Sequence, residues 1–394
     1  MRDGNGRRSI AVLNRIADIA SAEWDACAGT DTPFVTHAFL EALESSGSAA
    51  AKTGWLPRHL VVRDSGGKVV GCAPLYLKSH SLGEYVFDWG WADAYERAGG
   101  SYYPKLQCAV PFTPVTGPRL MVRAGEAPEP VVQALTGGLL ALARDMAVSS
   151  LHVTFPTGAE ALRLERAGFL LRLGYQYHWE NRGYGSFDDF LAALSSRKRK
   201  QVRRERDAVA AGGLRLTTLA GGEVTARHWD AFHRLYRATT GRKWGEAYLT
   251  RPFFERLSAS ALGDRVVLMM AYDGGTPIAA AFSMLGGDTL FGRNWGAAGE
   301  VPFLHFELCY YRALDFAIAH GLKRVEAGAQ GEHKVSRGYR PAATWSAHWI
   351  ADPAFRTRIA HFLADERPLV AEDMAEQAAA GPYRRDTPYS SSME

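Results

Sequence analysis

The stretch TLFGRNWGAAGEVPFLHFELCYYRALDFAIAHGLKRVEA, residues 289–327, decides the fold. Thr289–Gly296 and Leu322–Ala327 are short runs rich in strand-forming residues, and both are predicted strands. Between them, Phe303–His320 carries apolar residues at helical spacing and stops at Gly321, which predicts a helix. Strands that alternate with helices along the chain indicate an α/β protein.

The same order of elements occurs earlier in the chain. A predicted strand hairpin precedes each copy, at residues 59–78 and 266–285, and the short strands LHVTF (151–155) and KRVEA (323–327) correspond. An aromatic strand is expected over residues 84–91 as the counterpart of 289–296. The final alternating strands end alike, in Tyr177-His-Trp179 and Ala347-His-Trp349. The prediction is therefore an α/β (α+β) fold of two duplicated units, each a mixed twisted sheet flanked by helices.

We expect an N-terminal domain over residues 1–180, a C-terminal domain over 181–380 and a flexible tail over 381–394. The 394 residues are 47% hydrophobic and 22% charged, as in globular proteins, and the net charge is +4. Four cysteines lie far apart without a CxxC pair, and no signal peptide or apolar membrane span is apparent. A cytoplasmic protein without a metal site is expected. The P-loop, GxGxxG, HExxH and GxSxG motifs are all missing, which argues against those nucleotide-binding and hydrolase classes.

A strongly basic segment lies in the second half. Ser186-Phe-Asp-Asp189 is a capping-box pattern, and it predicts one long helix over residues 186–211. Cations cluster on that helix, and the candidates for RNA or phosphate binding are Arg197, Lys198, Arg199, Lys200, Arg203 and Arg204. An anionic lipid surface would suit the same charges, and a solvated helix with local ion pairs is the structural alternative.

The loop after the last predicted short strand, residues 330–341, brings an acid, an imidazole and cations together between two glycines. Such loops, held by a rigid scaffold, often carry catalysis. Its candidates are Gln330, Glu332, His333, Lys334, Arg337 and Tyr339. A polar turn whose charges pair with one another is the alternative.

Two further groups suit a charged or planar ligand. The first is Arg242, Lys243 and Trp244, which could bind a carboxylate, phosphate or base, or could simply end a helix. The second comprises polar residues amid aromatics in the two aromatic strands: Asp88 and Trp89 in the first half, and Arg293, Asn294 and Trp295 in the second. Ordinary strand alternation is the alternative for this second group.

Several segments together resemble a known family. They are FDWGWADAY (87–95), YYPKLQ (102–107), PFTPVTGPR (111–119), and GAQGEHK (328–334) followed by Arg337-Gly-Tyr339. SSRKRK (195–200) and RKWG (242–245) fit as well. Over about residues 10–370 the chain is similar to the FemAB-like branch of the GNAT superfamily, predicted N-acyltransferases described as peptidoglycan biosynthesis proteins.

This resemblance implies tandem GNAT-like domains and amide formation by acyl transfer. It implies transfer of an aminoacyl group from aminoacyl-tRNA to an amine of a cell-wall precursor or small molecule. GNAT enzymes that use acyl-CoA hold its pyrophosphate on a Gln/Arg-x-x-Gly-x-Gly/Ala loop, and residues 296–303 lack that pattern. An acyl-CoA-dependent N-acyltransferase is the alternative function, and a non-catalytic protein that binds RNA or an anionic surface is the second alternative.

The roles expected at the site follow from acyl transfer. Glu332 or His333 is the candidate base, and a backbone N–H near Asn294 is the candidate oxyanion donor. The remaining candidates would bind the donor or acceptor. The acyl donor is expected as a co-substrate, with no permanently bound cofactor. Expected partners are tRNA and a small-molecule or peptide amine; peripheral membrane contact and the oligomeric state stay open.

Overall fold

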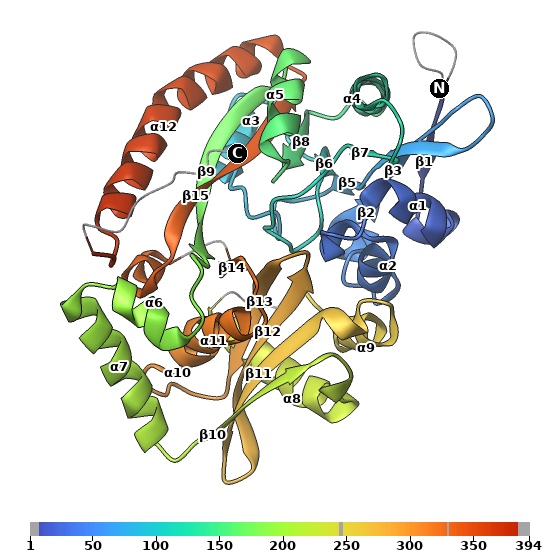
Figure 1. Cartoon of the computed structure of the whole chain (residues 1–394). Coiled ribbons are helices and arrows are strands. Elements are labelled where there is room, and N and C mark those ends of the chain that lie inside the picture. Colours follow the sequence, from blue (N-terminus) through green and yellow to red (C-terminus); the bar gives the residue numbers. More distant parts are fainter. Residues whose placement is uncertain (1–7, 244–246, 329–330, 385–394) are drawn as a thin grey trace. The chain divides into compact units, whose positions relative to one another are not determined.

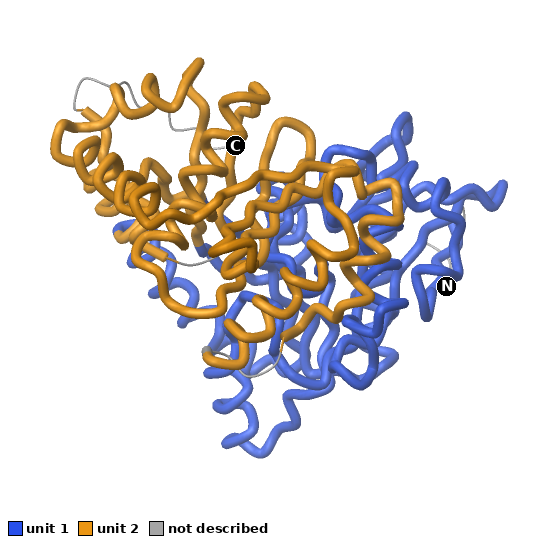
Figure 2. Tube along the Cα trace, turned by 90° about the horizontal axis from the view of Figure 1, so that it is seen from below, with its two compact units in different colours: residues 1–174, 343–372 blue, residues 175–342, 373–394 orange. Residues whose placement is uncertain are grey.

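The computed structural model describes residues 8–243, 247–328 and 331–384. The chain divides into two compact units (Figure 2). Unit 1 comprises residues 1–174 and 343–372, and unit 2 comprises residues 175–342 and 373–394. The expected mixed α/β architecture is confirmed in both (Figure 1).

Unit 1 contains most of the first half of the chain. Its elements are β1 (Ser9–Leu13), α1 (Ser21–Ala28), α2 (His37–Ser45), β2 (Trp55–Pro57), β3 (His59–Arg63), β4 (Val69–Ala73), β5 (Leu75–Lys78), α3 (Trp89–Arg97), β6 (Lys105–Cys108), β7 (Met121–Val122), α4 (Pro128–Asp145), β8 (Ser150–Thr154) and α5 (Gly158–Arg166). The chain leaves unit 1 within β9 (Leu170–Glu180).

Unit 2 contains most of the second half of the chain. Its elements are α6 (Phe187–Ala193), α7 (Ser196–Ala211), β10 (Arg215–Ala220), α8 (Ala226–Lys243), α9 (Arg251–Ala259), β11 (Val266–Asp273), β12 (Thr276–Gly286), β13 (Thr289–Ala297), α10 (Leu304–Phe306), a π-helical turn (Glu307–Tyr311), α11 (Arg312–Ala319), β14 (Arg324–Glu326) and a 3-10 helix (Glu332–Arg337). The chain returns to unit 1 within β15 (Arg340–Ile350) and continues into α12 (Pro353–Ala379), whose residues from Asp373 onward belong to unit 2.

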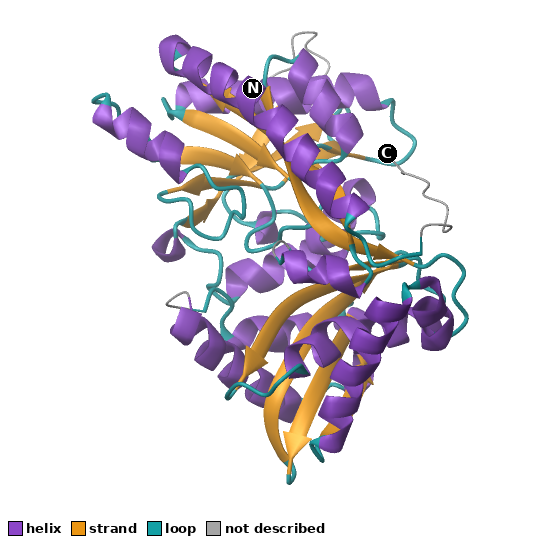
Figure 3. Ribbon diagram, turned by 90° about the vertical axis from the view of Figure 1, so that its left-hand side faces the viewer, coloured by secondary structure: helices purple, strands orange, loops and turns teal. Residues whose placement is uncertain are grey.

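The sheet of unit 2 runs β10-β11-β12-β13-β14 and then β9, and helices cover both of its faces (Figure 3). Alternation along β11 explains this. Val267 and Met269 join the cluster that contains Leu308 and Leu314 of the helical segment after β13. On the other face, Phe282 of β12 contacts Trp229 and Phe232 of α8, with ring centroids 5.4 and 5.9 Å apart. Both sets are buried, so the strands are apolar on both faces.

Unit 1 packs in the same way around the strands β8, β6, β5 and β2 and a second small sheet, β1-β3-β4-β7. Helices α4 and α5 contribute Leu135, Leu139 and Leu164 to its main core. A second cluster joins Trp91 of α3 to Phe355 and Ile359 of α12.

Each unit contains one parallel strand pair joined through a helix. β13 and β14 run parallel, with Phe291 beside Glu326, and β6 and β8 run parallel, with Gln107 beside His152. Next to each parallel pair lies the strand that carries the His-Trp sequence. His178 of β9 pairs with Glu326 in unit 2, and His348 of β15 pairs with His152 in unit 1. Residues 343–372, expected in the C-terminal domain, therefore pack in unit 1.

Three local expectations need correction. Residues 84–91 do not form a strand: they are a loop that leads into α3 at Trp89. The helix expected over 186–211 is two helices, because Leu194 is extended and pairs with Tyr383, and Ser195 N donates to Pro382 O. Tyr383 therefore docks on unit 2 in the region expected to be a flexible tail, and residues 385–394 of that tail lie outside the described residues.

Candidate functional site

The edge where β13 and β14 separate is the first feature of unit 2 that suggests a site. The two strands pair only from Thr289 to Phe291, and β13 then continues to Ala297. A bulge shifts the register at this point, so that Phe282 pairs with Asn294 but Ser283 pairs with Gly292, which leaves Arg293 as the extra residue. Bulges are common beside active sites because they redirect side chains.

A carboxyl group lies at this edge. Glu326, the last residue of β14, is buried, and its Oε2 atom has no hydrogen-bond partner among the described residues. Burial raises the pKa of Glu326 to about 7, although Arg324 and Arg293 favour its ionised form. A buried carboxyl oxygen left without a hydrogen bond is costly, which makes Glu326 a candidate functional group.

The cross-strand neighbour of this carboxyl is an imidazole. His178 Nε2 lies 3.7 Å from Glu326 Oε2 and, in the described part of the chain, also lacks a hydrogen bond. Burial, together with Arg324 and Lys334, lowers the pKa of His178 to about 3, so the imidazole is neutral near pH 7. A carboxyl with a pKa near 7 beside a neutral imidazole is suited to accept a proton.

The equivalent position of unit 1 holds two histidines that bind each other. Cross-strand pairing there joins His152 to His348, with their Nδ1 atoms 2.7 Å apart. The Nε2 atoms bind Ser150 at 2.8 Å and Ser346 at 2.9 Å. All four ring nitrogens are thus satisfied, which is typical of a structural polar pair.

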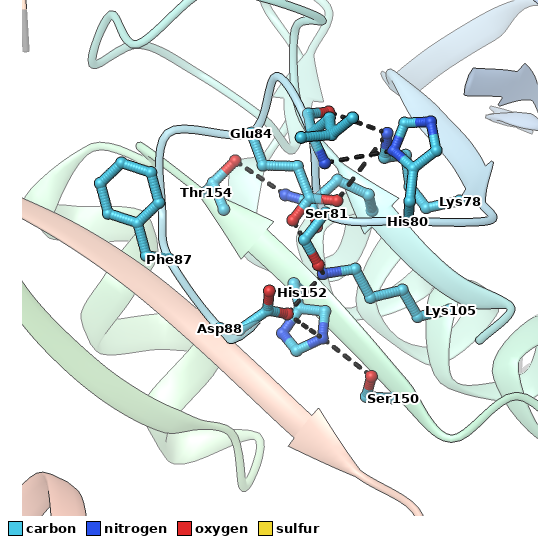
Figure 4. A network of polar contacts seen from close by, with 12 residues as sticks. Lys78, His80, Ser81, Glu84, Phe87, Asp88, Lys105, Ser150, His152 and Thr154 are labelled. Atoms are coloured by element: carbon cyan, nitrogen blue, oxygen red, sulfur yellow. Dashed lines mark hydrogen bonds and ion pairs between the residues drawn. The ribbon is translucent and has the colours of Figure 1, made fainter. Parts of the chain in front are cut away.

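Asp88 belongs to a buried network that includes His152 (Figure 4). Asp88 accepts hydrogen bonds from Lys105 Nζ and, at 2.7 Å, from Tyr102 OH, and lies 3.7 Å from His152. Lys105 also binds Glu84 at 2.8 Å. Burial opposes ionisation of Asp88, but Lys105 and His152 outweigh it and lower the pKa of Asp88. Asp88 therefore has an internal cation as its partner.

Sequence reasoning missed most of this network. Lys78 and Lys105 are fully buried lysines, with Glu84 beside both of them. Lys78 lies 3.7 Å from the centre of the Trp55 ring, and burial lowers its pKa to about 7. The one available signal for Lys105 was its place in the YYPKLQ segment. Trp89, by contrast, is about half exposed, with its ring 5.2 Å from that of Phe87.

The predicted catalytic loop is a compact 3-10 helix. Glu332 and His333 are exposed, and His333 Nε2 lies 2.8 Å from Tyr310 OH. Partial burial, Arg337 and Lys334 lower the pKa of His333. The ring of His333 is 6.1 Å from that of His305, and the ring of Trp295 in β13 is 5.1 Å from that of His305. The structure therefore links this loop to β13 through aromatic rings.

The cations of this loop turn inward. Arg337 is buried, binds both oxygens of Glu205 at 2.9 and 2.8 Å, and lies over the Phe306 ring. Lys334 Nζ donates to Gly328 O at 2.9 Å, and burial lowers its pKa to about 8. Tyr339 is fully buried. The guanidinium of Arg337 is thus occupied by an internal carboxylate.

The remaining binding candidates have mixed positions. Arg242 donates to Ala297 O at 2.8 Å and to Ala298 O at 3.2 Å, so it ties α8 to the end of β13. Asn294 Oδ1 is buried without a hydrogen-bond partner among the described residues. Arg293 and Trp295 are half-buried on β13. Trp244, Gln330 and the side chain of Lys243 lie outside the described residues.

The basic segment, α7, has two faces. Val202, Glu205 and Val209 are buried, and Arg206 binds Glu307 at 3.1 Å and Asp315 at 2.7 Å. Of the predicted RNA-binding cations, four are exposed, namely Arg197, Lys200, Arg203 and Arg204, while Lys198 and Arg199 are partly exposed. Only Arg203 among these six forms an ion pair with a described residue, namely with Asp188. The cations therefore form a basic face on α7 and do not surround the helix.

The first turn of α7 strengthens this electrostatic feature. It contains Arg197, Lys198 and Arg199 and no acidic residue. The helix macrodipole disfavours cations at an N-terminus, so these charges are favourable only beside an anion or water.

No group of His, Cys, Asp and Glu in the described residues could hold a metal ion, and no described helix is long and apolar enough to span a bilayer.

Comparison with known proteins places the fold. FemX is 13% identical, with 87% of this chain and 98% of FemX covered and a TM-score of 0.53. The C-terminal domain of a putative lysylphosphatidylglycerol synthetase from Agrobacterium fabrum is 8% identical, with 88% and 95% covered and a TM-score of 0.51. L-PGS from Bacillus licheniformis is 10% identical, with 84% and 96% covered and a TM-score of 0.50.

These likenesses confirm the expected fold. No curated protein sequence matches the chain. The FemAB-like family, described as peptidoglycan biosynthesis/recognition, matches residues 15–385. The chain therefore belongs to the FemAB-like family, and this membership points to an acyltransferase in general.

Proposed function

We propose that this protein is an N-acyltransferase that forms an amide bond, with aminoacyl-tRNA as donor and an amine as acceptor. The acceptor amine belongs to a peptidoglycan precursor or a related small molecule. The site lies in unit 2, at the edge of β13 beyond Phe291.

The observation that carries this proposal is the contrast between two equivalent pairs. In unit 1, His152 and His348 are fully hydrogen-bonded. In unit 2, Glu326 and His178 occupy the corresponding register positions and each keeps a buried polar atom without a partner in the described part of the chain. Because unsatisfied buried groups are costly, a ligand or reactant is the best reason to retain them.

The chemistry needs a proton acceptor. An amine is mostly protonated near pH 7, and it must lose a proton before or while it attacks the ester carbonyl of the donor. Glu326, with a pKa of about 7, accepts that proton directly or through a water. The new C–N bond forms and the C–O bond to the tRNA ribose breaks. Of the two protons that the ammonium group loses, one passes through Glu326 to the leaving 3′-oxygen and the other is released to solvent.

The negative charge that develops on the carbonyl oxygen needs hydrogen-bond donors. A backbone N–H of β13 near Asn294, beyond the last pair with β14, serves this role in our proposal. His333 remains the second candidate base because it lies near β13 through His305 and Trp295. Glu332, which is exposed, is the third candidate.

The basic face of α7 favours tRNA as the source of the acyl group. Five of its six predicted cations have no ion-pair partner among the described residues. Neutralisation of phosphates by such cations gives binding that weakens steeply with salt. Acyl-CoA would instead require a pyrophosphate loop, and residues 296–303 lack the usual pattern for one.

The test uses tRNA charged with a radiolabelled amino acid and a peptidoglycan-precursor peptide with a free side-chain amine. Transfer of label to the peptide, dependent on Glu326, is the expected result. Label transfer from acyl-CoA with no use of charged tRNA would replace the donor in this proposal. Salt-sensitive tRNA binding without transfer to any amine would indicate the non-catalytic alternative.

A further inference from the structure

Unit 2 contains a pocket that shares no residue with the edge of β13 discussed above. It lies between α8 and the chain that leads into α9, and its volume is about 780 Å³. Pockets for small molecules commonly measure roughly 300–1,000 Å³. The described residues that line it are Asp230, His233, Arg234, Arg237, Ala238, Gly241, Ala247, Leu249, Thr250 and Arg251.

The charge of this pocket is strongly unbalanced. Among its described lining residues, three guanidinium groups and one imidazole stand against one carboxylate, that of Asp230. That carboxylate is already taken, because Arg251 Nε donates to it at 2.8 Å. Arg251 also lies 3.2 Å from Glu255, which leaves Arg234 and Arg237 as the cations without an ion-pair partner in the described chain.

The imidazole of His233 is affected by the positive charges of this pocket. Partial burial is the main reason that its pKa is lowered, and Arg237 and Arg251 lower it further. A neutral imidazole beside two uncompensated guanidinium groups offers hydrogen bonding without adding repulsion. The pocket is therefore suited to an anion.

The two unpaired arginines are held by a rigid element. Arg234 and Arg237 are three residues apart, so they share one face of α8. The opposite face of α8 is anchored by the buried side chains of Phe232, Leu235 and Tyr236. The polypeptide also enters α9 at this pocket, through Thr250 and Arg251, and the N-terminus of a helix adds partial positive charge.

We propose that this pocket binds a phosphorylated small molecule through two adjacent phosphate groups. Each guanidinium presents a planar pair of N–H donors that matches a phosphate, and two such groups side by side match a diphosphate better than a single anion. The volume leaves room for the organic part of the ligand beside Leu249 and Ala238. The inference goes beyond the proposed transfer reaction and does not depend on it.

The test measures binding of inorganic pyrophosphate to the full chain by calorimetry, with inorganic phosphate for comparison. We expect pyrophosphate to bind more tightly than phosphate. In the R234A/R237A variant, pyrophosphate should bind at least about tenfold more weakly, since two charged hydrogen-bond donors are removed. The R234K/R237K variant keeps the charge but not the planar fork, so an intermediate loss is expected.

A charge-matched control removes two exposed arginines elsewhere in unit 2. R203A/R204A alters the basic face of α7 and should leave pyrophosphate affinity unchanged. Circular dichroism confirms that each variant is folded.

Four results would overturn the proposal. The first is no pyrophosphate binding to the wild type, and the second is equal binding to wild type and R234A/R237A. The third is an equal loss in R234A/R237A and R203A/R204A, which would indicate a general charge effect. If R234A/R237A weakened tRNA binding as much as pyrophosphate binding, the pocket would serve RNA and the small-molecule assignment would be wrong.

Discussion

Replacement of Glu326 by Gln tests two effects separately: the free energy that ionisation of this buried carboxyl costs the folded state, and the role of the carboxyl in the transfer reaction. Burial raises the pKa of Glu326 from an ordinary value of 4.5 to about 7. The folded protein therefore binds this proton more tightly than the unfolded chain. The stability that the protonated group contributes is fully present below pH 4.5 and is lost as the pH rises through 7.

The size of the effect follows from the shift. Each pKa unit corresponds to about 1.4 kcal/mol, so ionisation of Glu326 costs the folded state about 3 kcal/mol at pH 8. Glutamine has nearly the same shape and no charge. The E326Q variant should therefore lose less stability than the wild type between pH 5 and pH 8, by about 2–3 kcal/mol.

Urea unfolding of both proteins at pH 5 and pH 8 measures this difference. The matched control is E332Q, which removes an exposed carboxylate in the neighbouring loop and should leave the pH dependence unchanged. In the transfer assay, E326Q should lower the turnover rate by about 10²–10⁴-fold, the usual contribution of a general base.

Parallel stability profiles for wild type and E326Q would refute the reasoning, because they would mean that Glu326 is not held in a charge-excluding environment. A second possible result would contradict only the proposed catalytic role of Glu326. If E326Q showed the expected gain at pH 8 but transferred label at the wild-type rate, Glu326 would be a buried structural carboxyl. The base would then lie elsewhere, with His333 next to be tested.

Three further outcomes are expected. Glu205→Ala leaves the buried Arg337 guanidinium without its carboxylate, which should cost about 3–5 kcal/mol in urea unfolding, whereas Arg203→Ala, which breaks an exposed pair, should cost less than about 1 kcal/mol. The R203A/R204A variant should bind tRNA more weakly, and the slope of log K against log salt should fall by about one for each phosphate that the variant no longer neutralises. A fragment of residues 1–180 lacks β15, which completes the sheet beside β8, so it should show no cooperative unfolding transition, while the full chain should show one.

The elements with the longest periodic patterns were predictable. The order strand, helix, strand over residues 289–327 is present as β13, the helical segment 304–319 and β14. Helix α4 likewise follows from its apolar spacing. These elements bury a continuous apolar stripe, so local pattern and tertiary packing agree.

The aromatic segment 84–91 shows where local pattern fails. Its hydrophobic residues resemble a strand, but Asp88 within it is drawn into the core by Lys105. That pairing fixes a loop and the start of α3 in place of a strand. The counterpart of β13 is therefore β6, which comes later in the chain and pairs in parallel with β8. The sequence alone could not show that a lysine far along the chain would be buried.

Glu326 was missed for a related reason. In the segment KRVEA it resembles one more polar residue at the end of an exposed short strand, because Lys323 and Arg324 precede it. Its environment depends on β9, which lies well over a hundred residues earlier in the chain and covers it with His178. The loop 331–337 drew attention instead because its charges are dense, yet Arg337 is paired with Glu205 and Lys334 donates to the Gly328 carbonyl.

The likeness between Tyr177-His-Trp179 and Ala347-His-Trp349 acquires its meaning from the strand order. Each histidine lies on the strand next to the parallel pair and has a cross-strand partner in that pair. His348 faces His152 in unit 1, and His178 faces Glu326 in unit 2. Duplication would place the same kind of polar pair in both units. In unit 1 both members of the pair are histidines and are fully hydrogen-bonded, whereas in unit 2 one member is a carboxyl group with a pKa of about 7. A catalytic group in one unit and a structural group in the other is therefore the division of roles that the geometry favours, and H348Q should affect stability while H178Q affects the pH dependence of transfer.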